Sequence, residues 1–165
     1  MIPIDMKEGA RHPTKKSGVL EILKYTDRDN VLVSFLTTGY TKVSGTRAIR
    51  IGSVKDPYYP LICNKGFIGE GPYSSTADRV AYDAWRNMLD RCYGSSGNYP
   101  TYVDCTVVPA WFNFQNFAEW FNSQKNSYTK GYELDKDILV KGNKVYSPDT
   151  CSIVPKAENL REAHR

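Results

Sequence analysis

The chain has 165 residues, of which 41% are hydrophobic, 13% aromatic and 24% charged. This composition excludes an intrinsically disordered chain, and no apolar run approaches the roughly 18 residues of a membrane-spanning helix. The net charge of +4 permits a nucleic-acid partner without requiring one. The length suits one domain or two small ones.

The first 55 residues are expected to form a small β-rich module that carries a basic arm. Residues 1–17 are polar and basic, which predicts the surface arm. One strand is predicted at 19–25 and, after the turn at 27–30, a second at 31–35, where Val31, Val33 and Phe35 recur with a period of two; together they predict a β-hairpin. Two further short strands are expected at 40–43 and 46–51. The whole module should therefore be antiparallel.

Residues 56–75 are expected to form a loop-rich linker, because prolines and glycines are frequent there. The linker also carries the aromatic residues Tyr58, Tyr59, Phe67 and Tyr73. Two interpretations of these rings remain open. They pack between the two modules, or they form a contact surface for another protein.

Two helices are predicted in the remaining segment, 76–165. The first begins after an N-cap at Ser75 or Thr76 and ends before Gly94, with apolar residues at helical spacing on one face. The second covers about 113–122 and has an aromatic face. A third, short helix could follow Pro155.

The four cysteines suggest neither a zinc site nor a disulfide framework. Cys63, Cys92, Cys105 and Cys151 never occur in the close Cys-x-x-Cys spacing of zinc ligands. No signal peptide is recognised, so we expect reduced thiols in a cytoplasmic protein, packed as small hydrophobic groups.

Three sequence blocks match a family pattern in order and spacing. The block at 82–93, YDAWRNMLDRCY, matches W-x-x-M-x-x-R-C-Y, and the segments at 102–107 and 111–117 match a following cysteine–tryptophan–phenylalanine block. The block at 134–137, LDKD, is followed at 146–155 by YSPDTCSIVP. Together with 38–40, 49–50 and 54–57, these blocks cover nearly the whole chain. The chain resembles the phage-type HNH (ββα-Me finger) homing endonuclease family.

The resemblance implies an α+β protein in which a β module positions double-stranded DNA. A ββα-Me finger within 76–165 would hold one divalent cation and hydrolyse a phosphodiester bond. The expected cation is Mg²⁺, for which Mn²⁺ can substitute. It also implies the cytoplasm of a phage-infected bacterium as the location, and a membrane is not expected as a partner.

The site implied by the resemblance departs from the family pattern, because the expected histidine is replaced by Lys136. The only histidines are His12 and His164, near the ends of the sequence. The candidate catalytic residues are Asp135, Lys136, Asp137, Asp149 and Thr150, and the candidate metal ligands are Asp135, Asp137 and Asp149. Asp135 and Asp137 are two residues apart and would share one side of a strand. Thr150 best matches the position of the ligand on the finger's helix.

The same residues also fit a purely structural interpretation. In this interpretation, the acidic block is a solvated turn with salt bridges. The Gly-Asn pair at 142–143 is typical of a turn, and the Ser-Pro-Asp segment at 147–149 equally fits a helix N-cap.

The basic residues supply the candidate DNA contacts, which would bind phosphates rather than read bases. These candidates are Arg11, Lys15, Lys16, Lys42, Arg47, Arg50 and Lys55. The sequence leaves three functions open: a metal-dependent endonuclease that lacks the histidine, a catalytically inactive DNA-binding protein on the same scaffold, and a phage protein that binds and inhibits a host protein.

Overall fold

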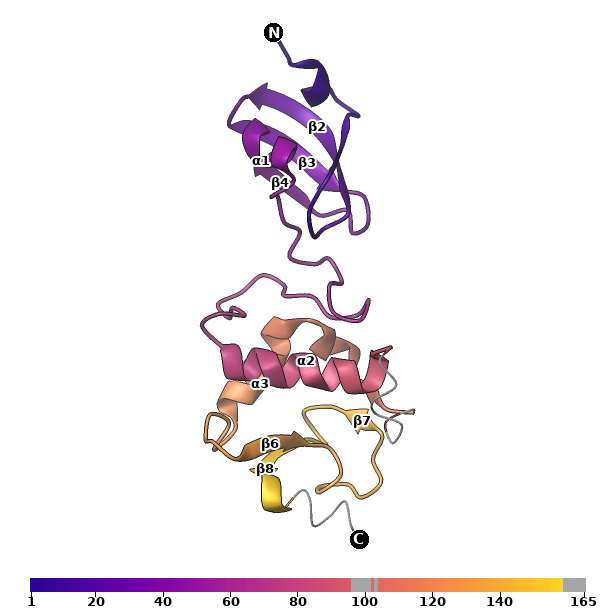
Figure 1. Ribbon diagram of the computed structural model, residues 1–165, viewed down its shortest axis with the longest axis vertical. Coiled ribbons are helices and arrows are strands. Elements are labelled where there is room, and N and C mark those ends of the chain that lie inside the picture. The colour runs from indigo at the N-terminus through magenta and orange to yellow at the C-terminus, as the bar shows by residue number, and fades with distance from the viewer. Residues whose placement is uncertain (96–101, 103, 159–165) are drawn as a thin grey trace. The chain divides into compact units, whose positions relative to one another are not determined.

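The computed structural model describes residues 1–95, 102 and 104–158, and it divides the chain into two compact units, Met1–Leu61 and Ile62–Arg165 (Figure 1). The boundary falls inside the segment expected to be a linker. Both helices and strands are present, and the first unit contains an antiparallel sheet. The predicted α+β class and the N-terminal antiparallel β module are therefore confirmed.

Unit 1 is built on a four-stranded antiparallel meander in the order β1-β2-β3-β4. The strands are β1 (Arg11–Pro13), β2 (Val19–Asp27), β3 (Asn30–Phe35) and β4 (Thr41–Ser44). Alternation along β2 and β3 places Leu20, Ile22, Val31, Val33 and Phe35 on one buried face, where Ile49 and Val54 join them. The hairpin predicted from the alternation is confirmed.

The expected basic arm is instead part of the fold of unit 1. Residues Ile4–Met6 form a short 3₁₀ helix, η1, and Met6 is fully buried in the core. Strand β1 pairs with β2 through Arg11–Glu21 and His12–Leu20. Because burial of Met6 and strand pairing both anchor the segment, the prediction of a free arm is wrong.

Residues 46–51 were expected to be a strand, but they form the helix α1 (Thr46–Ile51). Gly52 ends it in the left-handed conformation (φ 73°), and its N–H bonds back to the carbonyls of Ala48 and Ile49. The helix buries Ile49 in the core and leaves Ile51 54% exposed. A strand would have placed both isoleucines on the same face, whereas the helix turns Ile49 inward and Ile51 toward solvent.

The two predicted helices of unit 2 are confirmed as α2 (Arg79–Tyr93) and α3 (Phe114–Ser123). The residue that precedes α2 is Asp78, a few residues later than predicted. The side chain of Asn113 caps α3 by accepting a hydrogen bond from the Gln115 N–H. Between them, the 3₁₀ helix η3 (Pro109–Phe112) brings Trp111 into the core, where its carbonyl accepts the Trp85 indole N–H at 2.7 Å.

Two short strand pairs complete unit 2. Strand β5 (Thr106–Val107) runs parallel to β7 (Val145–Tyr146), and β6 (Tyr132–Asp135) pairs antiparallel with β8 (Ser152–Pro155). A helical turn begins immediately after β8, at 156–158. Most of the short helix expected after Pro155 lies outside the described residues.

The segment that precedes α2 is attached to α3 by a buried side chain. The Gln115 carboxamide accepts the Tyr73 N–H at 3.0 Å and donates to the carbonyls of Ile68 and Tyr73. Phe67 bonds through its backbone to Phe112 and Phe114. Residues 67–73 therefore fold with unit 2.

Candidate functional site

The acidic segment at the end of β6 is a turn stabilised by Asp135. Asp135 is 7% exposed, and its Oδ2 accepts the N–H groups of Asp137 at 2.8 Å and Ile138 at 2.6 Å. Asp137 lies beyond the end of the strand. The expectation that Asp135 and Asp137 face the same side of one strand is therefore wrong, because the chain turns between them and the first carboxylate caps the turn.

Lys136 is buried and paired with its neighbour. Its side chain is 7% exposed, and its ammonium lies 2.9 Å from each carboxylate oxygen of Asp137. The rings of Tyr102 and Tyr146 lie 5.4 and 5.9 Å from Nζ. Burial by itself lowers the pKa of Lys136, but hydrogen bonding to Asp137 and its charge raise that pKa above the ordinary value. Lys136 therefore stays protonated at neutral pH.

The remaining candidate residues lie in the turn before β8. Asp149 is exposed, and the Thr150 hydroxyl donates to the Val145 carbonyl at 2.9 Å. Ser147 Oγ and Thr150 Oγ1 lie 2.8 Å apart, which completes a local turn. The match of Thr150 to a helix position is wrong, because the helical turn starts after β8, at residue 156.

These side chains do not fit a Mg²⁺ site in the described arrangement. A magnesium ion needs several oxygen ligands that converge on one point. One oxygen of Asp135 already holds two backbone N–H groups, and the Lys136 ammonium occupies the Asp137 carboxylate. Within the described residues, no three histidine, cysteine, aspartate or glutamate side chains gather closely enough to hold a metal.

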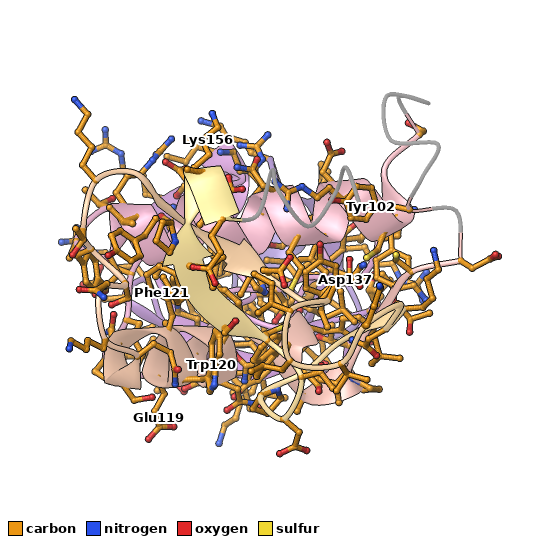
Figure 2. The ribbon with its side chains drawn as sticks, turned by 90° about the horizontal axis from the view of Figure 1, so that it is seen from below. Tyr102, Glu119, Trp120, Phe121, Asp137 and Lys156 are labelled. Atoms are coloured by element: carbon orange, nitrogen blue, oxygen red, sulfur yellow. The ribbon has the colours of Figure 1, made fainter. Side chains whose placement is uncertain are left out.

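Three residues near Lys136 were not singled out as site residues. The guanidinium of Arg91, on α2, lies 5.8 Å from the Tyr102 ring and interacts with the Tyr146 hydroxyl. Burial strongly raises the pKa of Tyr146, so this phenol stays neutral. Figure 2 shows Tyr102 and Asp137 toward one end of unit 2, away from Phe121 on α3. No local sequence pattern signals this cluster, because Arg91, Tyr102 and Tyr146 lie in three separate segments that only the fold brings together.

The predicted DNA-binding residues divide into two groups. Arg50 forms an ion pair with Asp5 at 2.7 Å, and Arg11 forms one with Glu21 at 3.1 Å. The others, Lys15, Lys16, Lys42, Arg47 and Lys55, are exposed and form no ion pair within residues 1–61, all of which are described.

Two hydrogen bonds hold the segments that carry three of these lysines next to each other. The Lys15 N–H bonds the Gly52 carbonyl at 2.9 Å, and the Asp56 N–H bonds the Ser17 hydroxyl at 3.0 Å. These bonds fix the 15–16 turn beside residue 55. We call Lys15, Lys16 and Lys55 the lysine patch.

Unit 1 carries the whole positive surplus of the protein. It has ten lysines and arginines against six acidic residues, whereas unit 2 has twelve of each. The acidic groups of unit 1 are also largely engaged, because Asp5, Glu21 and Asp29 form ion pairs and Asp56 is buried. The exposed lysines therefore act as an uncompensated positive surface.

The aromatic residues of segment 56–75 pack within their own units. The Tyr58 ring lies 5.6 Å from the Tyr40 ring in unit 1, and Phe67 and Tyr73 are bonded to α3 and its N-terminal flank.

No helix in the described part of the chain is long and apolar enough to cross a membrane. Comparison with protein families, curated proteins and solved structures finds no match.

Proposed function

We propose that the protein binds DNA through unit 1 and does not cleave it, as a catalytically inactive protein on an HNH-like scaffold. The observation that carries this proposal is the charge distribution: the net +4 resides in unit 1, where seven of ten cations have no carboxylate partner within the unit. DNA presents a dense line of phosphates that such a surface complements, and contacts of this kind bind without reading the sequence.

The geometry of the turn that follows β6 supports the absence of cleavage. Lys136, which replaces the expected histidine, is a buried ammonium bound by Asp137, so it has no lone pair to accept a proton from water. Asp135 is committed to backbone N–H groups. The group that would activate water and the group that would hold a cation are both engaged in maintaining the turn.

Metal-dependent cleavage is the second candidate, and one observation favours it. Strands β6 and β8 are antiparallel, and a helical turn follows β8 directly, which is the element order of a ββα finger. The carboxylates of Asp135 and Asp137 do not fit the cation in the described arrangement, because backbone N–H groups and Lys136 already engage them.

Two assays separate the candidates. A gel-shift titration of a 30-base-pair duplex at several salt concentrations should give an affinity that falls steeply as salt rises. A supercoiled-plasmid nicking assay with Mg²⁺ or Mn²⁺ should give no nicking beyond an EDTA control. Metal-dependent nicking that disappears in Asp135→Ala would overturn the inactive assignment, and the absence of any gel shift would overturn DNA binding.

A further inference from the structure

The loop between Asp137 and β7 presents two adjacent apolar side chains to solvent. Leu139 is 59% exposed and Val140 is 49% exposed. Lys141 follows them directly, and Lys144 lies on the other limb of the loop; both are exposed. Residues 139–144 therefore combine two neighbouring exposed apolar side chains with two exposed cations.

The tip is held at both limbs by hydrogen bonds. Asn143 bridges the loop: its side-chain amide donates to the carbonyls of Lys136 and Val145, and its Oδ1 accepts the Val145 N–H at 3.2 Å. The Asn143 N–H bonds the Val140 carbonyl at 3.0 Å across the turn, where Gly142 has φ 74°. At the start of the loop, Asp135 accepts the Ile138 N–H. At its end, the Lys144 carbonyl accepts the N–H of Thr106, on β5, at 2.8 Å.

This clamping means that the apolar tip is preorganised. A loop fixed in its bound conformation loses little conformational entropy when a partner covers it. The local charge also has a defined sign, because the Asp137 charge is neutralised by Lys136 and Asp135 is buried. The solvent-facing part of the loop is therefore apolar at its tip and positive on its flanks.

We propose that Leu139 and Val140 insert as a wedge between neighbouring base pairs of duplex DNA, while Lys141 and Lys144 contact the adjacent phosphates. This inference rests on the proposed function. Base-pair faces are apolar and lie behind two rows of phosphates, so a duplex offers the two chemistries in the arrangement that the loop presents. Apolar side chains that enter base steps in this way unstack and kink the duplex.

A bilayer with anionic headgroups is the other surface with an apolar interior and a negative face. The loop fits a base step better, because its apolar part is two adjacent side chains, whereas peripheral membrane attachment uses a long apolar face or an acyl chain. Anionic vesicles therefore serve as the competing arm of the test.

The test is plasmid unwinding. A closed circular plasmid is relaxed by topoisomerase I in the presence of the protein, and the topoisomers are resolved after the protein is removed. Wedge insertion unwinds the duplex, so the wild-type protein should shift the topoisomer distribution, and Leu139→Ala/Val140→Ala should abolish the shift and weaken DNA binding about tenfold. Lys141→Ala/Lys144→Ala should reduce the salt slope of binding by about two.

Val43→Ala/Ile51→Ala is the matched control, since it removes two equally exposed apolar side chains from unit 1. It should leave the topoisomer shift intact. A gel shift without any topoisomer shift would overturn the wedge and leave DNA binding standing, whereas no gel shift would overturn both. Sedimentation with phosphatidylserine vesicles that depends on Leu139 and Val140, without unwinding, would also overturn the wedge.

Discussion

Lys136 donates hydrogen bonds of 2.9 Å to both carboxylate oxygens of Asp137, its neighbour in the chain. The ammonium is almost fully buried, whereas the carboxylate is 43% exposed. The residue that stands in place of the expected histidine is thereby fixed as a cation with a structural partner. The pair explains why this turn, although acidic in sequence, has little free negative charge with which to attract a metal.

Asp137→Asn should destabilise the protein by about 1–3 kcal/mol at pH 7, because it leaves a buried ammonium without its counter-charge. The larger loss of stability that follows the breaking of a fully buried ion pair is not expected, since Asp137 is partly solvated. In the wild type, the pKa of Lys136 in the folded state lies above its ordinary value of 10.5. The stabilisation from the pair is therefore fully present below pH 10.5 and is lost as the pH rises through the folded-state pKa. In the variant, the largest influences that raise the pKa of Lys136 are lost while burial still lowers it, so this pKa should fall. The deficit should therefore shrink between pH 7 and pH 10.

Urea unfolding at several pH values checks this prediction. Asp149→Asn is the control, because Asp149 is exposed, and it should have little effect at any pH. A deficit for Asp137→Asn that stays constant with pH would contradict the assigned role of the pair.

Changing the lysine patch to glutamine (Lys15→Gln/Lys16→Gln/Lys55→Gln) should weaken DNA binding and reduce the salt slope by about 2–3, because each lysine that contacts a phosphate contributes about 0.9. Arg50→Gln is the matched control. It removes a cation that Asp5 already binds at 2.7 Å, so its effect on affinity should be smaller than that of any patch lysine. Gel shifts at four salt concentrations measure both, and equal losses would exclude the patch as the contact surface.

Gln115→Ala should cost about 2–4 kcal/mol in the free energy of unfolding. The substitution leaves the Tyr73 N–H and the carbonyls of Ile68 and Tyr73 without their partner in a largely buried position. Asn116→Ala, at the next position of α3, removes one exposed hydrogen bond to the Ala110 carbonyl and should cost less than about 1 kcal/mol. Chemical denaturation distinguishes the two, and similar costs would refute the role of Gln115.

Gly69→Ala should destabilise unit 2 by about 2–3 kcal/mol. Gly69 has φ 73°, which strains any side chain, and an added Cβ would overlap the Asn113 carboxamide that caps α3. Gly39→Ala tests the strain alone, because Gly39 has φ 76° with open space around it, and it should cost about 1–2 kcal/mol. Thermal melts should rank the two variants in this order.

Native cysteine labelling should be slow at Cys92 and Cys151. Burial raises the pKa of both thiols to about 12, so at pH 8 only about one thiol in ten thousand is the reactive thiolate. Cys63, which is only partly buried, should label first. Mass spectrometry after timed maleimide treatment, with and without urea, measures the order, and early labelling of Cys151 would show that the core around it opens.

Local patterns in the sequence were sufficient where one face of an element is buried. The apolar spacing along 80–92 and 114–121 predicted α2 and α3, and alternation along 31–35 predicted β3. Burial of a single face imposes a period that can be read without knowing the partner. Residues 46–51 lacked such a pattern, and the overlooked signal was Gly52, which ends a helix in the left-handed conformation.

The sequence by itself determined that the chain is an α+β protein and that a lysine lies between two aspartates at 135–137. It also placed the positive surplus in the first part of the chain. Only the tertiary structure decided what those charges do. The carboxylate of Asp135 accepts hydrogen bonds from backbone N–H groups, and Lys136 is buried against Asp137 and two tyrosine rings. Hydrogen bonds between segments that are distant in the sequence hold the lysine patch together. The charge of a side chain follows from its identity, but its availability depends on burial and on partners that the fold supplies.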